Sequence, residues 1–154
     1  GGSKEVTTLE LRSKFSKTAI DYSRKAQKLG IKTALYMTHA YLDNDPRYEP
    51  NLIKKIELAY YDAGKKSKSA VIPVGIAYEM AYKERPNIKL HHPDGTHPGL
   101  LGTYLGSCVV FAAITGSSPE GLEYNYLNQI SKEDLIFLQK IAWKAYLKHK
   151  NQYN

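Results

Sequence analysis

Segments with a helical spacing of apolar residues alternate with short apolar runs, and this alternation most constrains the fold. Over residues 8–29 the apolar positions recur in steps of three and four, which predicts a helix that Gly30 ends. The run at 31–38 is short and mostly apolar, so it predicts a buried strand. The apolar positions of the helix are Leu11, Phe15, Ala19, Tyr22, Ala26 and Leu29.

The next part of the chain repeats this order. A turn-rich stretch at 43–50 precedes a second predicted helix over 52–63, which Gly64 and the lysines after it end. A strand is predicted over 70–74, with Pro73 at its end or at a sheet edge because proline cannot donate a ladder hydrogen bond. A short helix over 76–85 stops before Pro86, and 87–90 forms a small strand or an extended loop.

Two more helices complete the predicted elements. One covers 98–115, where Pro98 suits the first helical position, and the other runs over 131–149 from a capping box formed by Ser131 and Asp134. Helices that alternate with apolar strands predict an α/β layer architecture with parallel strands. Two clear strands and one doubtful strand make a thin sheet, however, so the chain is expected to form part of a larger domain.

Composition limits the class of protein. The 154 residues, 42% of them hydrophobic, suffice for one domain or part-domain over 1–154. No apolar run approaches the roughly 18 residues of a membrane span. The net charge of +7 invites nucleic-acid binding, but basic and acidic residues are interspersed, so a solvated surface without nucleic acid is predicted. The single cysteine, Cys108, excludes an internal disulfide and is predicted to be a buried thiol; the compartment stays open.

Asp94 and His97 are the candidate catalytic residues. A three-residue spacing in a tight turn can bring the carboxylate to one imidazole nitrogen and leave the other nitrogen as a general base. Pro98 restricts the backbone directly after the histidine. Such a base serves a nucleophile, usually a serine hydroxyl. Spacing alone leaves open the alternative that Asp94 and Thr96 only cap the following helix.

Other histidines are candidates for binding a metal ion or a substrate. His91 and His92 cluster with His97, but adjacent side chains of an extended segment point in opposite directions, so no metal site is predicted. No phosphate loop is present, and no cofactor is expected. His39 follows the first predicted strand, where it either lines a substrate cleft or is a partly exposed structural histidine.

The stretch Leu-His-His-Pro-Asp-Gly-Thr-His-Pro-Gly-Leu-Leu-Gly-Thr-Tyr-Leu-Gly-Ser-Cys at 90–108 resembles the last conserved block of SGNH (GDSL-like) hydrolases. That block reads Asp-x-x-His-Pro and is followed by a helix with small residues. The segments 30–38 and 71–77 resemble the family's preceding strands, and the resemblance covers about 9–121. It implies a three-layer α/β/α, flavodoxin-like parallel sheet, present here as a C-terminal half with the helix 131–149 added.

The resemblance also implies a reaction. His97 would be the general base and Asp94 its orienting partner in a serine esterase or acylhydrolase that acts on a small-molecule ester, such as an acylated carbohydrate or lipid. The family's Gly-Asp-Ser block and its oxyanion glycine and asparagine are not found, because Gly2-Ser3 and Gly106-Ser107 lack the preceding strand. We therefore expect self-association or pairing with a missing N-terminal half. The alternative is a non-catalytic binding or interaction domain on the same scaffold.

Overall fold

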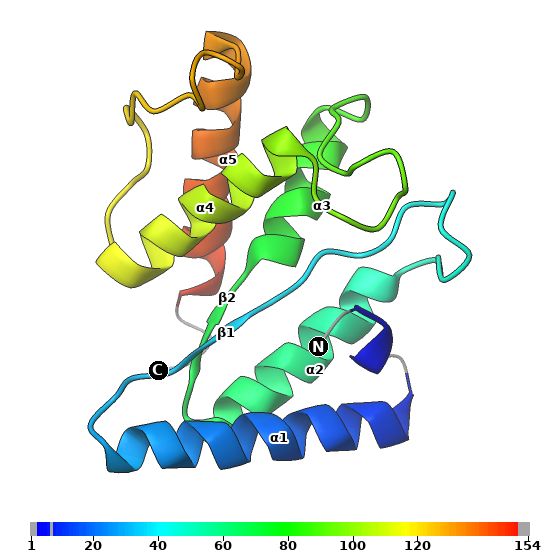
Figure 1. Cartoon of the computed structure of the whole chain (residues 1–154), viewed down its shortest axis with the longest axis vertical. Coiled ribbons are helices and arrows are strands. Elements are labelled where there is room, and N and C mark those ends of the chain that lie inside the picture. The colour runs from blue at the N-terminus through cyan, green and yellow to red at the C-terminus, as the bar shows by residue number, and fades with distance from the viewer. Residues whose placement is uncertain (1–2, 7, 151–154) are drawn as a thin grey trace.

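The computed structural model describes residues 3–6 and 8–150, and in this part of the chain two short strands lie between groups of helices (Figure 1). In chain order the elements are the 3-10 helix η1 (Ser3–Val6), α1 (Leu9–Lys28), β1 (Ala34–Tyr36), α2 (Leu52–Ser67), β2 (Ala70–Ile72), α3 (Val74–Glu84), α4 (Leu100–Thr115) and α5 (Lys132–His149).

The sheet of the described residues contains β1 and β2 alone, paired in parallel with Leu35 opposite Val71. The predicted parallel pairing is confirmed, but the three-layer flavodoxin-like sheet is wrong, because the chain is mostly helical. The doubtful strand at 87–90 does not form. Instead, the carbonyl of Leu90 accepts the N–H of Gly99 at 2.7 Å, and His91 forms an isolated antiparallel bridge with Pro98. The end of this segment therefore pairs with residues 98–99 of the same loop and adds no strand to the sheet.

Two hydrophobic clusters lie against opposite faces of the strand pair. Val71 belongs to a cluster with α2 and η1, whereas the next residue, Ile72, belongs to a cluster with α3, α4 and α5. Successive strand residues point to opposite faces, so β2 joins the two clusters. Figure 1 shows α1 and α2 on one side of the strands and α3, α4 and α5 on the other. None of the helices in the described ranges has both the length and the apolar character to cross a membrane.

The helix ends differ from the predicted ones for local reasons. α2 continues past Gly64, which is buried inside it, and ends at Lys68 in a left-handed conformation with φ of 54°. In α1 the apolar positions that indicate the helix are not its most buried ones, since Tyr22 is 71% exposed while Ser16 and Ser23 are buried. Small serines let α1 approach the rest of the protein closely, which the spacing of apolar residues alone does not reveal.

Ser131 is the N-cap of α5, as predicted, and its contact with Asp134 differs from the expected capping box in that the carboxylate bonds the serine hydroxyl. The hydroxyl of Ser131 accepts the N–H of Asp134 at 3.1 Å and donates to the carboxylate of Asp134 at 2.8 Å. This arrangement satisfies one of the free N–H groups of the first turn. The cap stabilises the first turn of α5, directly after the segment that joins α4 to α5.

Candidate functional site

The loop between α3 and α4 folds back on itself and presents Asp94 and His97 at its tip. The N–H of His92 donates to the carbonyl of His97 at 2.7 Å, and the N–H of Gly95 donates to the carbonyl of His92 at 3.0 Å. Gly95 has φ of +71°, and a Cβ added there would lie 2.1 Å from Oδ1 of Asn44. Both the backbone angle and the lack of space require glycine at this turn.

Asp94 makes a hydrogen bond to the His97 side chain and also accepts backbone N–H groups. Its Oδ2 lies 2.8 Å from Nδ1 of His97, and its Oδ1 accepts the N–H groups of Thr96 and His97, each at 2.9 Å. The backbone and side-chain hydrogen bonds from His97, together with that from Thr96, hold the pKa of Asp94 well below its usual range. The ionised carboxylate accepts the Nδ1 proton of His97, so in the neutral ring Nε2 carries the free lone pair.

The imidazole of His97 is open to solvent, with 75% of its side chain exposed. Nδ1 of His92 also lies 3.1 Å from Oδ2 of Asp94, so two histidines flank one carboxylate. The two predicted catalytic residues are therefore in direct contact. The second oxygen of this carboxylate bonds only within its own turn, so the predicted capping of the following helix is wrong: the N-cap of α4 is Gly99, without a side-chain cap.

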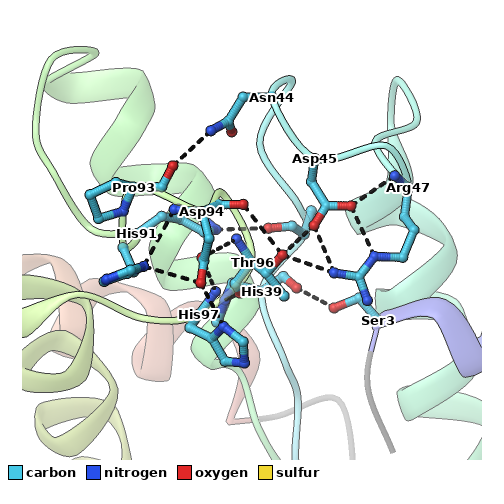
Figure 2. A network of polar contacts seen from close by, with 12 residues as sticks. Ser3, His39, Asn44, Asp45, Arg47, His91, Pro93, Asp94, Thr96 and His97 are labelled. Atoms are coloured by element: carbon cyan, nitrogen blue, oxygen red, sulfur yellow. Dashed lines mark hydrogen bonds and ion pairs between the residues drawn. The ribbon is translucent and has the colours of Figure 1, made fainter.

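An ion pair between the buried Asp45 and the exposed Arg47, both in the 39–47 loop, supports this turn (Figure 2). Asp45 is 4% exposed, and its carboxylate accepts two hydrogen bonds from the guanidinium of Arg47, at 2.9 and 2.7 Å. The Thr96 hydroxyl donates to the same carboxylate and accepts from Nη2 of Arg47 at 2.8 Å. The Arg47 hydrogen bonds hold the pKa of Asp45 well below its usual range. Thr96 is therefore joined to a fixed, charged pair.

Backbone hydrogen bonds connect the same two loops. The N–H of Leu42 donates to the carbonyl of Gly95 at 3.0 Å, and the Asn44 amide donates to the carbonyl of Pro93 at 2.9 Å. The Asp94 turn is therefore held at several points along its length. Residues that support a site in this way restrict the geometry of the side chains it presents.

His39 lies between the Asp94 turn and the core residue Tyr78. Its Nε2 lies 2.9 Å from the carbonyl oxygen of Thr96, and its ring stacks on Tyr78 with centroids 4.5 Å apart. Burial lowers the pKa of His39 to about 4, so the ring is neutral at physiological pH and Nε2–H donates to the carbonyl. His39 thus contacts the backbone next to His97, where it was predicted either to line a substrate cleft or to be structural.

The remaining histidines of the cluster separate as the sequence predicts. His91 is 8% exposed, accepts the Tyr82 hydroxyl at Nδ1 at 2.6 Å and donates from Nε2 to the carbonyl of Ala40 at 2.9 Å. His92 points to the Asp94 side. Within the described residues, no group of three or more histidine, cysteine, aspartate or glutamate side chains is arranged to hold a metal ion.

No serine hydroxyl is hydrogen-bonded to His97 in the described part of the chain. Ser3 is 5% exposed, and its hydroxyl donates to the carbonyl of His39 and lies 3.2 Å from Oγ1 of Thr38. Ser107 donates to the carbonyl of Thr103 within α4 at 2.9 Å. Neither Ser3 nor Ser107 therefore supplies a nucleophile to this base.

Sequence analysis missed the Asp45–Arg47 pair and the role of Thr96 as their partner. The stretch 43–50 was interpreted as a turn only, since Asn44-Asp45-Pro46 favours one. The spacing Asp-x-Arg is a weak signal for an ion pair. Nothing local indicates that this pair meets Thr96, which lies 49 residues after Arg47 in the chain.

Comparisons with known proteins identify a similar fold but indicate no activity. No protein-family model and no curated protein matches the chain. A crystal structure of a DUF4886 family protein from Bacteroides uniformis ATCC 8492 is similar, with a TM-score of 0.69 and 21% sequence identity over 76% of this chain. The chain spans about half of that structure, 48% of its length. At this identity the likeness shows a shared fold alone.

These findings correct the broader descriptions drawn from the motif resemblance. The chain is a helical protein with a small parallel sheet, so its description as an α/β layered chain is wrong, and nothing in these findings supports the lipase-like or GDSL-like description. Neither the fold nor the comparisons support an assignment to the hydrolases. The observations that bear on chemistry are the contact between Asp94 and His97 and the supports around it.

Proposed function

We propose that Asp94 and His97 act as the orienting carboxylate and the general base in ester hydrolysis by a serine hydroxyl. The observation that carries this proposal is the 2.8 Å contact between Oδ2 of Asp94 and Nδ1 of His97, on an imidazole whose side chain is 75% exposed. The resemblance of the Asp-x-x-His-Pro block to SGNH hydrolases suggests the ester substrate.

In this reaction Nε2 of His97 accepts the serine proton while the serine oxygen attacks the ester carbonyl. His97 then returns the proton to the leaving alcohol as the carbon–oxygen bond of the ester breaks. Water attacks the resulting acyl-serine with the same base and releases the acid. The ionised Asp94 stabilises the imidazolium that forms in each step.

The serine is proposed to come from a polypeptide segment outside the described residues. The residues that flank β1 bond to β2: the Thr33 carbonyl accepts the N–H of Ala70, and the Met37 N–H donates to the carbonyl of Ile72. Backbone groups alternate in direction along a parallel strand, so those of Ala34 and Tyr36 point away from β2, to the opposite edge of β1. In the described part of the chain that edge has no strand partner. We propose that a strand from a second copy or from an N-terminal segment pairs there.

The test uses the full-length protein encoded by the gene and measures its hydrolysis of p-nitrophenyl acetate. His97→Ala is expected to lower kcat/KM by about 100-fold or more, and Asp94→Asn to lower it through loss of the tautomer that presents Nε2. Lys89→Ala is the control, because Lys89 is exposed on the same loop and lies outside the pocket lining. Equal turnover by the His97→Ala and unsubstituted proteins would end this proposal.

A non-catalytic binding domain is the second candidate. It is favoured by the finding that no serine of the described residues is hydrogen-bonded to His97. A fluorophosphonate probe separates the two candidates, since it labels a serine only where a base activates it. Labelling that disappears in His97→Ala supports the esterase, whereas no labelling of the complete protein supports the binding domain.

A further inference from the structure

A pocket of about 620 Å³ lies between α4 and the segment that joins α4 to α5. Its volume falls in the range of small-molecule sites. One wall is α4 and the opposite wall is the segment around residues 122–130. The lining includes His92, Pro98, Leu100, Phe111, Tyr124 and Tyr126.

The pocket is continuous with the loop that carries the candidate base. His92 and Pro98 line it, His92 contacts the Asp94 carboxylate at 3.1 Å, and Pro98 directly follows His97. His97 itself lies outside the lining that the described residues form. A ligand in this pocket therefore ends beside the base without covering it.

We propose that this pocket binds the acyl chain of the ester substrate, and that the chain is a medium-length aliphatic one. The inference rests on the proposed function. Most of the side chains that line the pocket are aliphatic or aromatic; the polar ones, such as Thr103, Ser107 and Gln129, are uncharged, and no carboxylate, lysine or arginine is among the described residues that line it. An uncharged apolar group matches such a lining, whereas an acetyl group leaves most of the volume unfilled.

The inner wall offers no reactive group to such a ligand. Burial raises the pKa of the Cys108 thiol to about 11 and that of the Tyr104 hydroxyl to about 12. Both groups are therefore neutral at physiological pH, and neither is a nucleophile. The pocket would bind the acyl chain, and the reaction would take place at the loop that carries Asp94 and His97.

The outer wall is hydrogen-bonded to α5 at its start, Leu122. Gln139 of α5 is 1% exposed and donates to the carbonyl of Leu122 and to the hydroxyl of Tyr104, each at 2.8 Å. Its side-chain oxygen accepts the N–H of Gly121 at 3.0 Å. A single buried amide thus fixes both walls of the pocket relative to each other.

The rim of the same wall contains three successive left-handed residues. Tyr126, Leu127 and Asn128 have φ of 52°, 56° and 63°, a conformation that side chains disfavour. Asn125 stabilises this turn by accepting the N–H of Asn128 at 2.9 Å and donating to its side chain at 2.9 Å. Tyr126 of this turn and Tyr124 just before it both line the pocket.

The test measures binding and needs no turnover. Methyl hexanoate and methyl acetate are titrated into the ¹⁵N-labelled protein, and the amide shifts of α4 and 122–130 are followed by NMR. We expect saturable shifts with methyl hexanoate and at least about tenfold weaker binding of methyl acetate, since the longer ester buries additional methylene groups. Ser107→Trp should weaken methyl hexanoate binding about tenfold or more by filling the pocket.

Ile114→Trp is the matched control, because Ile114 is 74% exposed on the same helix and outside the pocket. Its binding of methyl hexanoate should stay within about twofold, and so should that of His97→Ala. Absence of shifts at the pocket amides, or equal binding by Ser107→Trp, would overturn the inference. Pocket binding that persists while His97→Ala retains full esterase activity would instead refute the proposed base and leave the apolar pocket established.

Discussion

Thr96 is the residue at which the two loops of the candidate site meet. Its N–H donates to Asp94 at 2.9 Å, its carbonyl accepts from His39 at 2.9 Å, and its hydroxyl joins Asp45 and Arg47. Every polar group of one small residue is therefore used. The position of the neighbouring imidazole consequently depends on a histidine and an ion pair that lie far from it in sequence.

His39 makes the stability of the protein depend on pH. Burial lowers its pKa to about 4, against about 6.5 in an unfolded chain. Between these values the unfolded state binds a proton that the folded state does not, so stability is complete above about pH 6.5 and falls as the pH decreases towards 4. We expect a loss of roughly 1 to 3 kcal/mol from this group, measured by urea unfolding at a series of pH values.

The variant His39→Gln should show a smaller decrease in the unfolding free energy over this pH range, because glutamine does not titrate. His92→Gln, whose imidazole is 59% exposed, should retain the full decrease. An unchanged pH profile in His39→Gln would show that the buried imidazole does not contribute to the acid sensitivity.

At the scale of elements, the C-terminus of α2 shows how backbone conformation, rather than composition, ends a helix. The N–H of Ser69 donates to the carbonyl of Gly64 at 2.9 Å, and Lys68 adopts the left-handed conformation that such an end requires. The sequence places its glycine inside the helix and a lysine at the left-handed position. The predicted helix therefore ended too early.

Two substitutions in this element should have opposite effects on stability. Lys68→Gly should raise the unfolding free energy by about 1 kcal/mol, because glycine adopts positive φ without a steric cost. Lys65→Gly, in the last turn of the same helix, should lower it by about 1 kcal/mol. Thermal and urea unfolding measure both, and a loss of stability in Lys68→Gly would contradict the assigned role of its backbone.

For the whole molecule, the sequence predicts local contacts better than the assembly of the site. The periods of apolar residues indicate the helices, and the three-residue spacing indicates the contact between Asp94 and His97. The width of the sheet could not be predicted, because a short segment of alternating polar and apolar residues such as 87–90 can pair with its own loop as readily as with a strand. The supports from Asp45 and Gln139 depend on segments that only the folded chain brings together.

The free edge of β1 leads to a prediction about association. Its neighbourhood exposes large apolar side chains, including Ile31 at 54% and Tyr36 at 47%. An unpaired edge beside apolar surface favours pairing with another chain, so sedimentation velocity should show a concentration-dependent shift above the monomer. Ala34→Lys should reduce the shift, and Thr18→Lys on the exposed surface of α1 should not. A monomer at all concentrations would contradict this prediction.

The turn at Asp94 also bears on chemical ageing. Aspartate followed by glycine is the sequence at which peptides most readily cyclise to a succinimide and reopen as isoaspartate, when the glycine nitrogen attacks the aspartyl side chain. Here the carboxylate is ionised and bound by several N–H groups, and the Gly95 N–H is donated to His92. The fold that positions the carboxylate thus also protects it from this reaction. Stored protein should accumulate isoaspartate at this position only as fast as the loop opens.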